Sequence, residues 1–275
     1  MNLERIESET NKKIKLAASL RLKKYRDREG LFIAEGIRLT EMAAQAAEWE
    51  AEFCLVTPQT AGQERVQAIL AMLQQRNCPV YEIDEALYRK AAHTVEPQGI
   101  MILLKMKRMG LEELTGGRHI PLLAVADGLQ DPGNAGTLIR SADAAGCTGV
   151  VFLENSVDVF SDKVVRSTMG SLFHLPVVMN VKTDVFVDFC HQHHMRILAA
   201  ALEPEAKYHF ALDYTGPSAL VFGNEGKGIS AELLQAADEK LYIPMMGQAE
   251  SLNAAMAASI VMYEALRQRM QAVQN

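Results

Sequence analysis

Three short polar loops in the second half of the chain each follow an apolar run with the character of a β-strand. The loops start at residues 127, 223 and 245, after apolar runs at 121–126, 219–222 and 241–244. In open α/β sheets, ligands bind just beyond the carboxyl ends of the strands. We therefore expect the three loops to lie together and to form one composite site.

Apolar runs alternate with helical patterns throughout this half of the chain. Strands are predicted at residues 121–126, 149–153, 176–179, 196–201, 219–223 and 240–244, and helices at about 135–145, 162–172, 183–193, 230–237 and 252–271. Continuous apolar strands separated by helices are typical of a mostly parallel sheet with both faces covered. The pattern predicts an α/β fold.

The first half of the chain has the pattern of a smaller α/β unit. Helices are predicted at about 11–25, 37–48 and 62–75, and strands at 31–34, 53–56, 80–83 and 99–104. Residues 106–119 contain three glycines and few core positions, which is typical of a linker. A chain of 275 residues is long enough for two domains, which we place at 1–105 and 120–275.

The composition is ordinary for a soluble globular protein, with 49% hydrophobic and 23% charged residues. Four scattered cysteines without a C-x-x-C pair favour reduced thiols in a cytoplasmic protein over a zinc site. We expect no metal at His191, His193 and His194, which have no carboxylate or cysteine at ligand spacing. Neither a signal peptide nor an apolar run of about 18 residues is present, so no membrane partner is expected.

The net charge of −6 hides a concentration of basic residues near the N-terminus. Between residues 12 and 28 the only acidic residue is Asp27. The eight basic residues of this stretch, which we call the basic segment, are Lys12, Lys13, Lys15, Arg21, Lys23, Lys24, Arg26 and Arg28. Such a cluster is either a solvated helix face or a contact surface for a nucleic-acid backbone.

The first loop ends in Asp131-Pro-Gly-Asn134, a turn sequence in which Asn134 is a good N-cap for the next helix. That helix is rich in Ala, Leu and Ile but carries Arg140, whose guanidinium needs a partner in apolar surroundings. A dinucleotide-binding loop is the main alternative. It is disfavoured because G-x-G-x-x-G is absent and the spacing here is Gly133-x-x-Gly136.

The second and third loops each allow a structural interpretation as well. Three glycines within residues 223–228 do not make a P-loop, and they fit either a tight turn or a close approach to a ligand. Glu225 among them is a candidate base, arginine partner or solvated charge. In the third loop Ser251 is a candidate cap for the last helix, while Ser251 and Asn253 on either side of Leu252 also suit ligand contact.

In this order, the three loops resemble the signature motifs of the SpoU (TrmH-type) RNA 2′-O-ribose methyltransferases of the SPOUT superfamily. The resemblance rests on Asn134-Ala-Gly136 with Arg140, on Phe222-Gly-Asn-Glu-Gly226, and on Ile243-Pro244 with Glu250-Ser-Leu-Asn253. Lys163 to Arg166 and Met169-Gly170 look like a further family segment. The first half resembles the RNA substrate-binding domain often attached to this family, through residues that include Phe32, Glu35-Gly36, Thr94 and Gln98-Gly99.

The resemblance implies that a deep trefoil knot lies in the second sheet, that the protein is a homodimer and that S-adenosyl-L-methionine is the cofactor. Gly223, Ile243 and Leu252 match positions that hold this cofactor. The implied substrate is RNA, with ribosomal RNA favoured and the basic segment as docking surface. One alternative is that the enzyme methylates transfer RNA. The other is that the protein binds RNA without catalysis and has kept the same fold.

The resemblance also implies a catalytic set that consists of Arg140, Asn134, Glu225, Ser251 and Asn253. A guanidinium is almost never neutral in proteins, so we expect Arg140 to act as a cation. It would hold the neighbouring phosphate and stabilise the alkoxide that develops on the ribose. Glu225 and Asn134 would orient Arg140, and Ser251 and Asn253 would position the ribose.

Overall fold

The computed structural model describes residues 3–116 and 119–274 and divides into two compact units. The first unit runs to Lys107 and also contains Phe160–Phe173. The second contains Arg108–Val159 and the chain from His174 onwards. A segment that lies between two strands of the second unit in the sequence therefore packs as part of the first unit.

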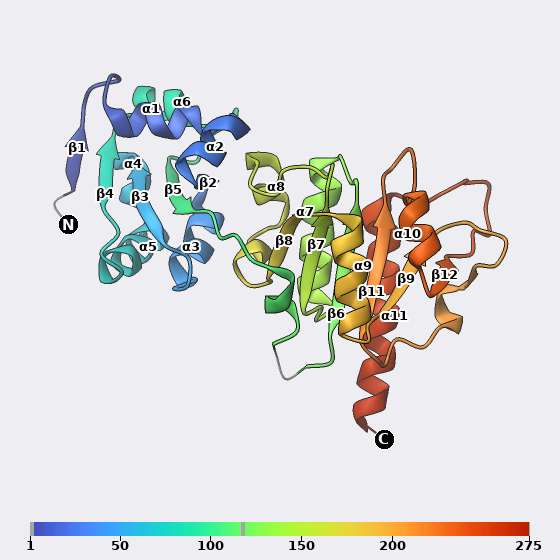
Figure 1. The fold of residues 1–275 in the computed structure, drawn as a ribbon. Helices are drawn as coiled ribbons and strands as arrows, with labels where there is room; N and C mark the ends of the chain where they lie inside the picture. Colours follow the sequence, from blue (N-terminus) through green and yellow to red (C-terminus); the bar gives the residue numbers. More distant parts are fainter. Residues whose placement is uncertain (1–2, 117–118, 275) are drawn as a thin grey trace. The chain divides into compact units, whose positions relative to one another are not determined.

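The first unit is built on a five-stranded mixed sheet with the order β1-β4-β3-β5-β2 (Figure 1). Its strands are β1 (Glu4–Ile6), β2 (Leu31–Glu35), β3 (Ala51–Val56), β4 (Val80–Ile83) and β5 (Ile100–Lys105). β4 pairs in parallel with β1 and β3, whereas β5 pairs antiparallel with β3 and β2. Every residue of β2 is buried, which explains its nearly continuous apolar sequence.

The helices of the first unit come from both of its chain segments. They are α1 (Lys12–Ser19), α2 (Lys23–Glu29), α3 (Ile37–Gln45), α4 (Pro58–Ala61), α5 (Glu64–Gln75), α6 (Glu85–Ala91), α8 (Asp162–Ser167) and the 3₁₀ turn η2 (Ser171–Phe173). Most of the predicted helices and strands of this half are present, with ends that move by a few residues. The short strand β1 had no sequence signal.

The single basic helix predicted over 11–25 is wrong, because α1 and α2 are separated by a break. Leu20 ends α1 with its side chain buried, and Leu22 before α2 has an extended backbone (φ −96°, ψ 129°). The buried guanidinium of Arg26 donates to the carbonyl oxygens of Leu20 (2.6 Å) and Arg21 (2.9 Å). The guanidinium thereby satisfies main-chain carbonyl groups at the end of α1, which have no partner within the helix.

The segment Phe160–Phe173 is held to the first unit by an aromatic cluster. The ring of Phe160 lies 4.8 Å from that of Phe32 and 6.4 Å from that of Trp49. Phe173 stacks on Phe32 at 6.5 Å and meets Trp49 edge-on at 5.6 Å. The indole N–H of Trp49 donates to the carbonyl oxygen of Phe173 (3.3 Å), so the attachment is polar as well as apolar.

The second unit is built on a seven-stranded sheet with the order β10-β12-β9-β11-β6-β7-β8 (Figure 1). The strands are β6 (Leu122–Asp127), β7 (Gly149–Leu153), β8 (Val177–Val181), β9 (Arg196–Ala200), β10 (Lys207–Tyr208), β11 (Ser218–Gly223) and β12 (Glu239–Tyr242). All the neighbouring strands pair in parallel, which confirms the predicted sheet. The two-residue strand β10 is too short to leave a periodic signal.

Helices cover both faces of this sheet. They are α7 (Pro132–Ala144), α9 (Thr183–Gln192), α10 (Ala231–Ala236) and α11 (Ala254–Gln274), with the 3₁₀ turns η1 (Leu111–Leu114) and η3 (His209–Ala211). α11 packs on α7 and β11, and α9 packs on α10. On the α9 and α10 side the core contains Phe186, Phe189 and Leu233. Within the described ranges, no helix is long and apolar enough to cross a membrane.

The strand order changes direction between β6 and β11. From β6 the chain proceeds to β7 and β8 on one side, while β11, β9 and β12 lie on the other. Such a point opens a crevice at the carboxyl ends of the strands, where open α/β sheets bind their ligands. The first and second polar loops leave the sheet at this point.

Candidate active site

The first two polar loops are joined by the carboxylate of Glu225. They follow the neighbouring strands β6 and β11, whose last residues, Asp127 and Gly223, are partners in the sheet. Glu225 Oε1 accepts hydrogen bonds from Asn134 Nδ2 (2.9 Å) and the Asp131 N–H (3.2 Å), and Oε2 accepts from the Gln130 N–H (3.3 Å). A single carboxylate thus holds the start of α7 against the second loop.

The third polar loop joins this network through Asn253, whose Nδ2 donates to Asn134 Oδ1 (2.8 Å). Asn134 is buried and uses its amide nitrogen toward Glu225 and its amide oxygen toward Asn253. The result is a chain of side-chain hydrogen bonds from Glu225 through Asn134 to Asn253. The three loops therefore meet, as their positions in the sequence predict.

The predicted N-cap role of Asn134 is wrong, because α7 begins earlier. Asp131 is the N-cap, and its Oδ1 accepts from the main-chain N–H of Asn134 (2.8 Å). Pro132 follows at the first helical position, where its missing N–H has no cost. With Asp131 as the cap, the amide of Asn134 is free to bridge the other two loops.

The predicted capping role of Ser251 is also wrong. Asn253 Oδ1 accepts from the N–H groups of Ala255 (3.0 Å) and Met256 (3.2 Å) and so takes the N-cap role at the start of α11. Ser251 is exposed, and its hydroxyl forms no hydrogen bond with the residues that the structure describes. It remains available to a ligand.

Glu225 has a lowered pKa, although its partial burial by itself would raise it. The hydrogen bonds from Asn134 and from the main-chain N–H groups of Glu225, Asp131 and Gln130 stabilise the charged form and outweigh the burial. A carboxylate that stays ionised and accepts several hydrogen bonds suits an anchoring role. Three hydrogen bonds tie this carboxylate to the loop before α7 and to its first turn, so the geometry favours an anchoring role for Glu225 over that of a general base.

Arg140 lies on α7, and the structure corrects its expected surroundings. The side chain is exposed, and within residues 3–116 and 119–274 it forms no hydrogen bond or ion pair. It forms no hydrogen bond or ion pair with Glu225 or Asn134, which were predicted to orient it. α7 buries one face and leaves the other in solvent, so an arginine on the solvent face needs no protein partner.

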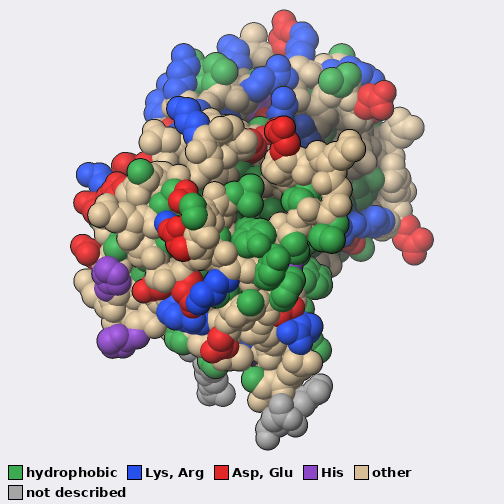
Figure 2. Space-filling view, turned by 90° about the vertical axis from the view of Figure 1, so that its right-hand side faces the viewer, with side chains coloured by type: hydrophobic (Ala, Val, Ile, Leu, Met, Phe, Trp, Pro, Cys, Tyr) green, Lys and Arg blue, Asp and Glu red, His purple; other side chains and the backbone are tan. Residues whose placement is uncertain are grey.

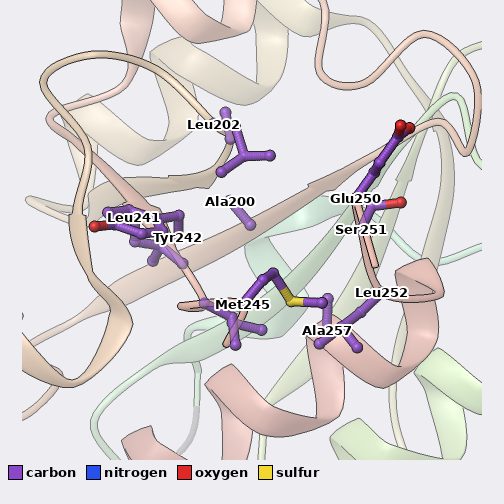
Figure 3. Close-up of a pocket in the computed structure, with 11 residues that line it drawn as sticks. Ala200, Leu202, Leu241, Tyr242, Met245, Glu250, Ser251, Leu252 and Ala257 are labelled. Carbon is purple, nitrogen blue, oxygen red and sulfur yellow. The ribbon is translucent and has the colours of Figure 1, made fainter. Parts of the chain in front are cut away.

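A cavity of about 150 Å³ opens beside the end of β12 and the third loop (Figure 3). Two of the residues predicted to hold the cofactor, Ile243 and Leu252, line it, together with Glu250 and Ser251. The other walls are mainly apolar and are formed by Ala200, Ala201, Leu202, Leu241, Tyr242, Met245 and Ala257. Ala200, Ala201 and Leu202, at the end of β9 and just after it, had no motif in the sequence to reveal them, because they reach the cavity through strand order.

Gly223, the third residue predicted to hold the cofactor, does not line this cavity. It precedes a tight loop that is closed by main-chain hydrogen bonds between Asn224 and Gly228 in both directions (2.9 Å each). A Cβ atom at Gly223 would collide with the main chain of Gly228. The structure therefore gives this glycine a role in closing the second loop.

Within the basic segment, Arg26 is buried, Lys13 is half-buried and the other side chains are exposed. Arg26 is buried and binds the carbonyl groups at the end of α1. Arg21 donates to the Ala92 carbonyl oxygen (2.7 Å), and Lys23 pairs with Asp27 (2.6 Å). Further cations of the segment are engaged locally: Lys13 and Lys24 lie over tyrosine rings, and Arg28 pairs with Glu29. Lys12 and Lys15 are exposed and have no partner among the described residues.

One of the histidines near the end of α9 is paired with a carboxylate. His193 pairs with Glu112 through Nε2 (3.1 Å). In the part of the chain that the structure describes, no group of three or more His, Cys, Asp or Glu side chains is arranged to hold a metal ion.

A parallel sheet with a cavity beside the end of β12 and a separate mixed-sheet unit define a two-unit α/β protein with a candidate ligand site in the second unit. Residues 121–263 match the SpoU rRNA Methylase family, and residues 11–102 match the MRM3-like substrate binding domain. The chain therefore belongs to the SpoU rRNA methylase family.

Relatives match over nearly the whole chain. The 23S rRNA (guanosine(2553)-2′-O)-methyltransferase RlmP of Bacillus subtilis is 36% identical, over 95% of this chain and 98% of its own length. The solved structure of the AdoMet-bound rRNA methyltransferase from Sinorhizobium meliloti is similar with a TM-score of 0.85 and 30% identity, over 96% of this chain and 98% of that one. The SpoU methyltransferase AviRb from Streptomyces viridochromogenes, in complex with AdoMet, has a TM-score of 0.83 and 29% identity, over 94% and 98%.

Proposed function

We propose that this protein transfers a methyl group from S-adenosyl-L-methionine to a ribose 2′-hydroxyl of ribosomal RNA. Membership of the SpoU rRNA methylase family supports the reaction class. Two relatives that match most of the chain carry names of 23S ribosomal RNA 2′-O-methyltransferases, which supports the substrate. The observation that carries the proposal is the bond chain from Glu225 through Asn134 to Asn253, which joins all three motif loops beside one cavity.

The residues around the cavity in the second unit fit S-adenosyl-L-methionine. Apolar side chains such as Leu202, Leu241 and Ile243 provide flat walls of the kind that purine bases pack against, and Tyr242 adds an aromatic ring. Glu250 and Ser251 provide polar groups at its edge (Figure 3). When bound, the cofactor supplies a methyl group on a positively charged sulfur.

The side chains of this protein would then orient the ribose and stabilise charge. A ribose hydroxyl gains negative charge as it attacks, and a fixed cation lowers the energy of that state. Arg140 suits this role because its guanidinium is permanently charged and no described protein group competes for it. Ser251, which is exposed and has no hydrogen-bond partner among the described residues, is the candidate to contact the ribose. Asn253 is already committed to Asn134 and to the start of α11, so it holds the loop in place.

We also propose that the protein works as a homodimer through α11. Met256, Ile260, Tyr263 and Met270 are exposed apolar residues on this helix, spaced so that they share one stripe. The hydroxyl of Ser141 bonds that of Ser259 (2.8 Å), so the residue next to Arg140 lies against the same helix. A second copy on this stripe would therefore approach Arg140.

Other exposed apolar residues lie at the β12 end of the second unit. Figure 2 shows hydrophobic side chains gathered on one face. Near β12, Leu202 and Leu252 are exposed and line the cavity, and the exposed rings of Tyr208 and Phe210 stack on each other beside Tyr242. Their position around the cavity fits a surface that a cofactor, the RNA or a second copy would cover. We further propose that the second sheet contains the deep trefoil knot and that the protein acts in the cytoplasm.

The test of the proposed function is methylation of ribosomal RNA from cells that lack this protein. With tritiated S-adenosyl-L-methionine, the label should enter the RNA at one site. A methyl group on a ribose 2′-oxygen blocks alkaline cleavage at that nucleotide, so the label should persist in an alkali-resistant dinucleotide. Label on a base would contradict the proposal, and so would ribosomal RNA that stays unlabelled while transfer RNA from the same cells is labelled in a parallel reaction.

A further inference from the structure

A second cavity, of about 270 Å³, lies entirely within the first unit. Its walls come from the start of α3, from the loop before β5 and from the end of α8 with the residues that follow it. These three places carry Glu35-Gly36, Thr94 with Gln98, and Arg166 with Met169. All of them belong to the family-like segments of the sequence that the methyl-transfer site does not use.

Two arginines line this cavity, and both have guanidinium N–H groups to spare. Arg38 is exposed and has no hydrogen bond or ion pair within residues 3–116 and 119–274. Among the described residues, Arg166 has one hydrogen-bond partner, with its Nη1 donating to Asp162 Oδ2 (3.1 Å), so its other guanidinium N–H groups are available. Arg38 is also the second residue of α3, where a positive side chain is unfavourable for the helix dipole. Its placement therefore brings no benefit to the stability of the helix.

The polar walls of this cavity are held in place by internal hydrogen bonds. The buried carboxylate of Glu35 accepts from the N–H of His93 (2.9 Å) and from the N–H (3.2 Å) and hydroxyl (2.5 Å) of Thr94. Gln98 Oε1 accepts from the N–H of Ile37 (2.9 Å), which fixes the amide at the start of α3. Preformed walls of this kind lower the entropy that a ligand loses on binding.

The mixture of groups selects a ligand that is both anionic and flat. Arginine forks bind phosphate oxygens in pairs. Glu96 and the amide of Gln98 complement the N–H and carbonyl edges of a nucleobase, and Leu39 and Met169 provide apolar surface for its face. A bare phosphate would use neither the carboxylate nor the apolar wall. The volume is just below the range of about 300–1,000 Å³ that small-molecule sites occupy.

We propose that this cavity binds one unpaired nucleotide of the RNA substrate, with the phosphate on Arg38 and Arg166 and the base inside. This inference rests on the proposed function and adds a recognition site remote in sequence from the methyl-transfer motifs. The site belongs to substrate binding and touches no reacting atom. Its loss therefore raises KM for RNA and leaves kcat unchanged.

The experiment compares Arg38→Ala with Arg38→Lys and with the control Arg89→Ala. Arg89 lies on α6 in the same unit, is exposed, has no partner among the described residues and does not line the cavity. The RNA is unmethylated ribosomal RNA from cells that lack this protein. Dissociation constants at several salt concentrations, KM, kcat and the affinity for S-adenosyl-L-methionine are measured for each variant.

Arg38→Ala should weaken RNA binding about tenfold, lower the salt slope by about one and raise KM, with Arg38→Lys in between. Cofactor affinity and kcat should stay at the wild-type values. Equal RNA binding by Arg38→Ala and Arg89→Ala would overturn the proposal.

A further arm uses AMP, GMP, CMP, UMP and inorganic phosphate as titrants. Micromolar binding of any of them that disappears in Arg38→Ala, together with unchanged RNA binding by that variant, would also overturn the proposal, because the cavity would then serve a free metabolite. Wild-type activity keeps the two hypotheses apart. If wild-type protein methylates ribosomal RNA and Arg38→Ala does not change RNA binding, only the proposal for the cavity is wrong. If wild-type protein binds this RNA through Arg38 but does not methylate it, the proposed reaction is wrong.

Discussion

Replacement of Phe160 by alanine should unfold the first unit at a much lower denaturant concentration. Phe160 is only 3% exposed, although it lies in sequence between strands of the second unit. A buried phenyl ring covers about 150 Å² or more, which at about 25 cal/mol per Å² is worth about 4 kcal/mol. Large-to-small changes at buried phenylalanines cost about 3–5 kcal/mol, which agrees with this figure.

Trp49 reports this change directly, because it is the only tryptophan of the chain and meets Phe160 edge-on. Urea unfolding is followed by its fluorescence. With a slope of about 2 kcal/mol per molar urea, a loss of about 4 kcal/mol lowers the midpoint by about 2 M. The control is Phe210→Ala, which truncates a half-exposed phenyl ring in the second unit.

The two variants should differ clearly. Phe210→Ala should leave the Trp49 transition within about 0.5 M of wild type, since surface changes cost little. A midpoint for Phe160→Ala that matches the control would refute the assignment of residues 160–173 to the first unit.

Three further outcomes follow from the structure. All four thiols are buried, and burial raises their pKa values, to about 12 for Cys147 and Cys190 and to about 11 for Cys78, with that of Cys54 raised as well. Ellman's reagent should therefore label no thiol at pH 8 until urea unfolds the protein. The pKa of Glu225 is lowered on folding, so its ionised form stabilises the fold above the ordinary glutamate pKa and this stability disappears as the pH falls through the folded value. Urea midpoints of wild type and Glu225→Gln should therefore differ at pH 7 and converge as the pH falls below the ordinary glutamate pKa and through the lowered folded value, and a gap independent of pH would contradict the role of the charge. Finally, Ile260→Asp with Tyr263→Asp should convert a dimer to a monomer in sedimentation, whereas Val185→Asp, at another half-exposed apolar residue, should not.

Much of the fold could be predicted from the sequence, because periodicity and apolar runs are local properties. The strand at Gly149–Leu153 and the helix at Thr183–Gln192 lie almost where the pattern placed them. The break after Leu20 could not be predicted, since it is stabilised by the guanidinium of Arg26 from the next helix. Nor could the attachment of Phe160 to the first unit, which depends on contacts with rings over 100 positions away in the sequence.

The candidate site, too, could be predicted from the sequence only in part. Position after a strand brought the three loops together in the prediction, because parallel strands align their carboxyl ends. The partners within the site were assigned less well. Glu225 and Asn134 bond each other and not Arg140, and Asp131 and Asn253 are the caps. Several residue types in a short loop are equally good caps, and only the main-chain path decides which of them is used.

The most direct test of the account is single-turnover methylation of ribosomal RNA by Arg140→Ala. The control is Arg108→Ala, an exposed arginine that also has no partner among the described residues. If Arg140 stabilises the developing alkoxide, its removal should slow methyl transfer by about 10²–10³-fold. The affinity for S-adenosyl-L-methionine should remain unchanged, and Arg108→Ala should react at the wild-type rate. A near-normal rate for Arg140→Ala would contradict the account.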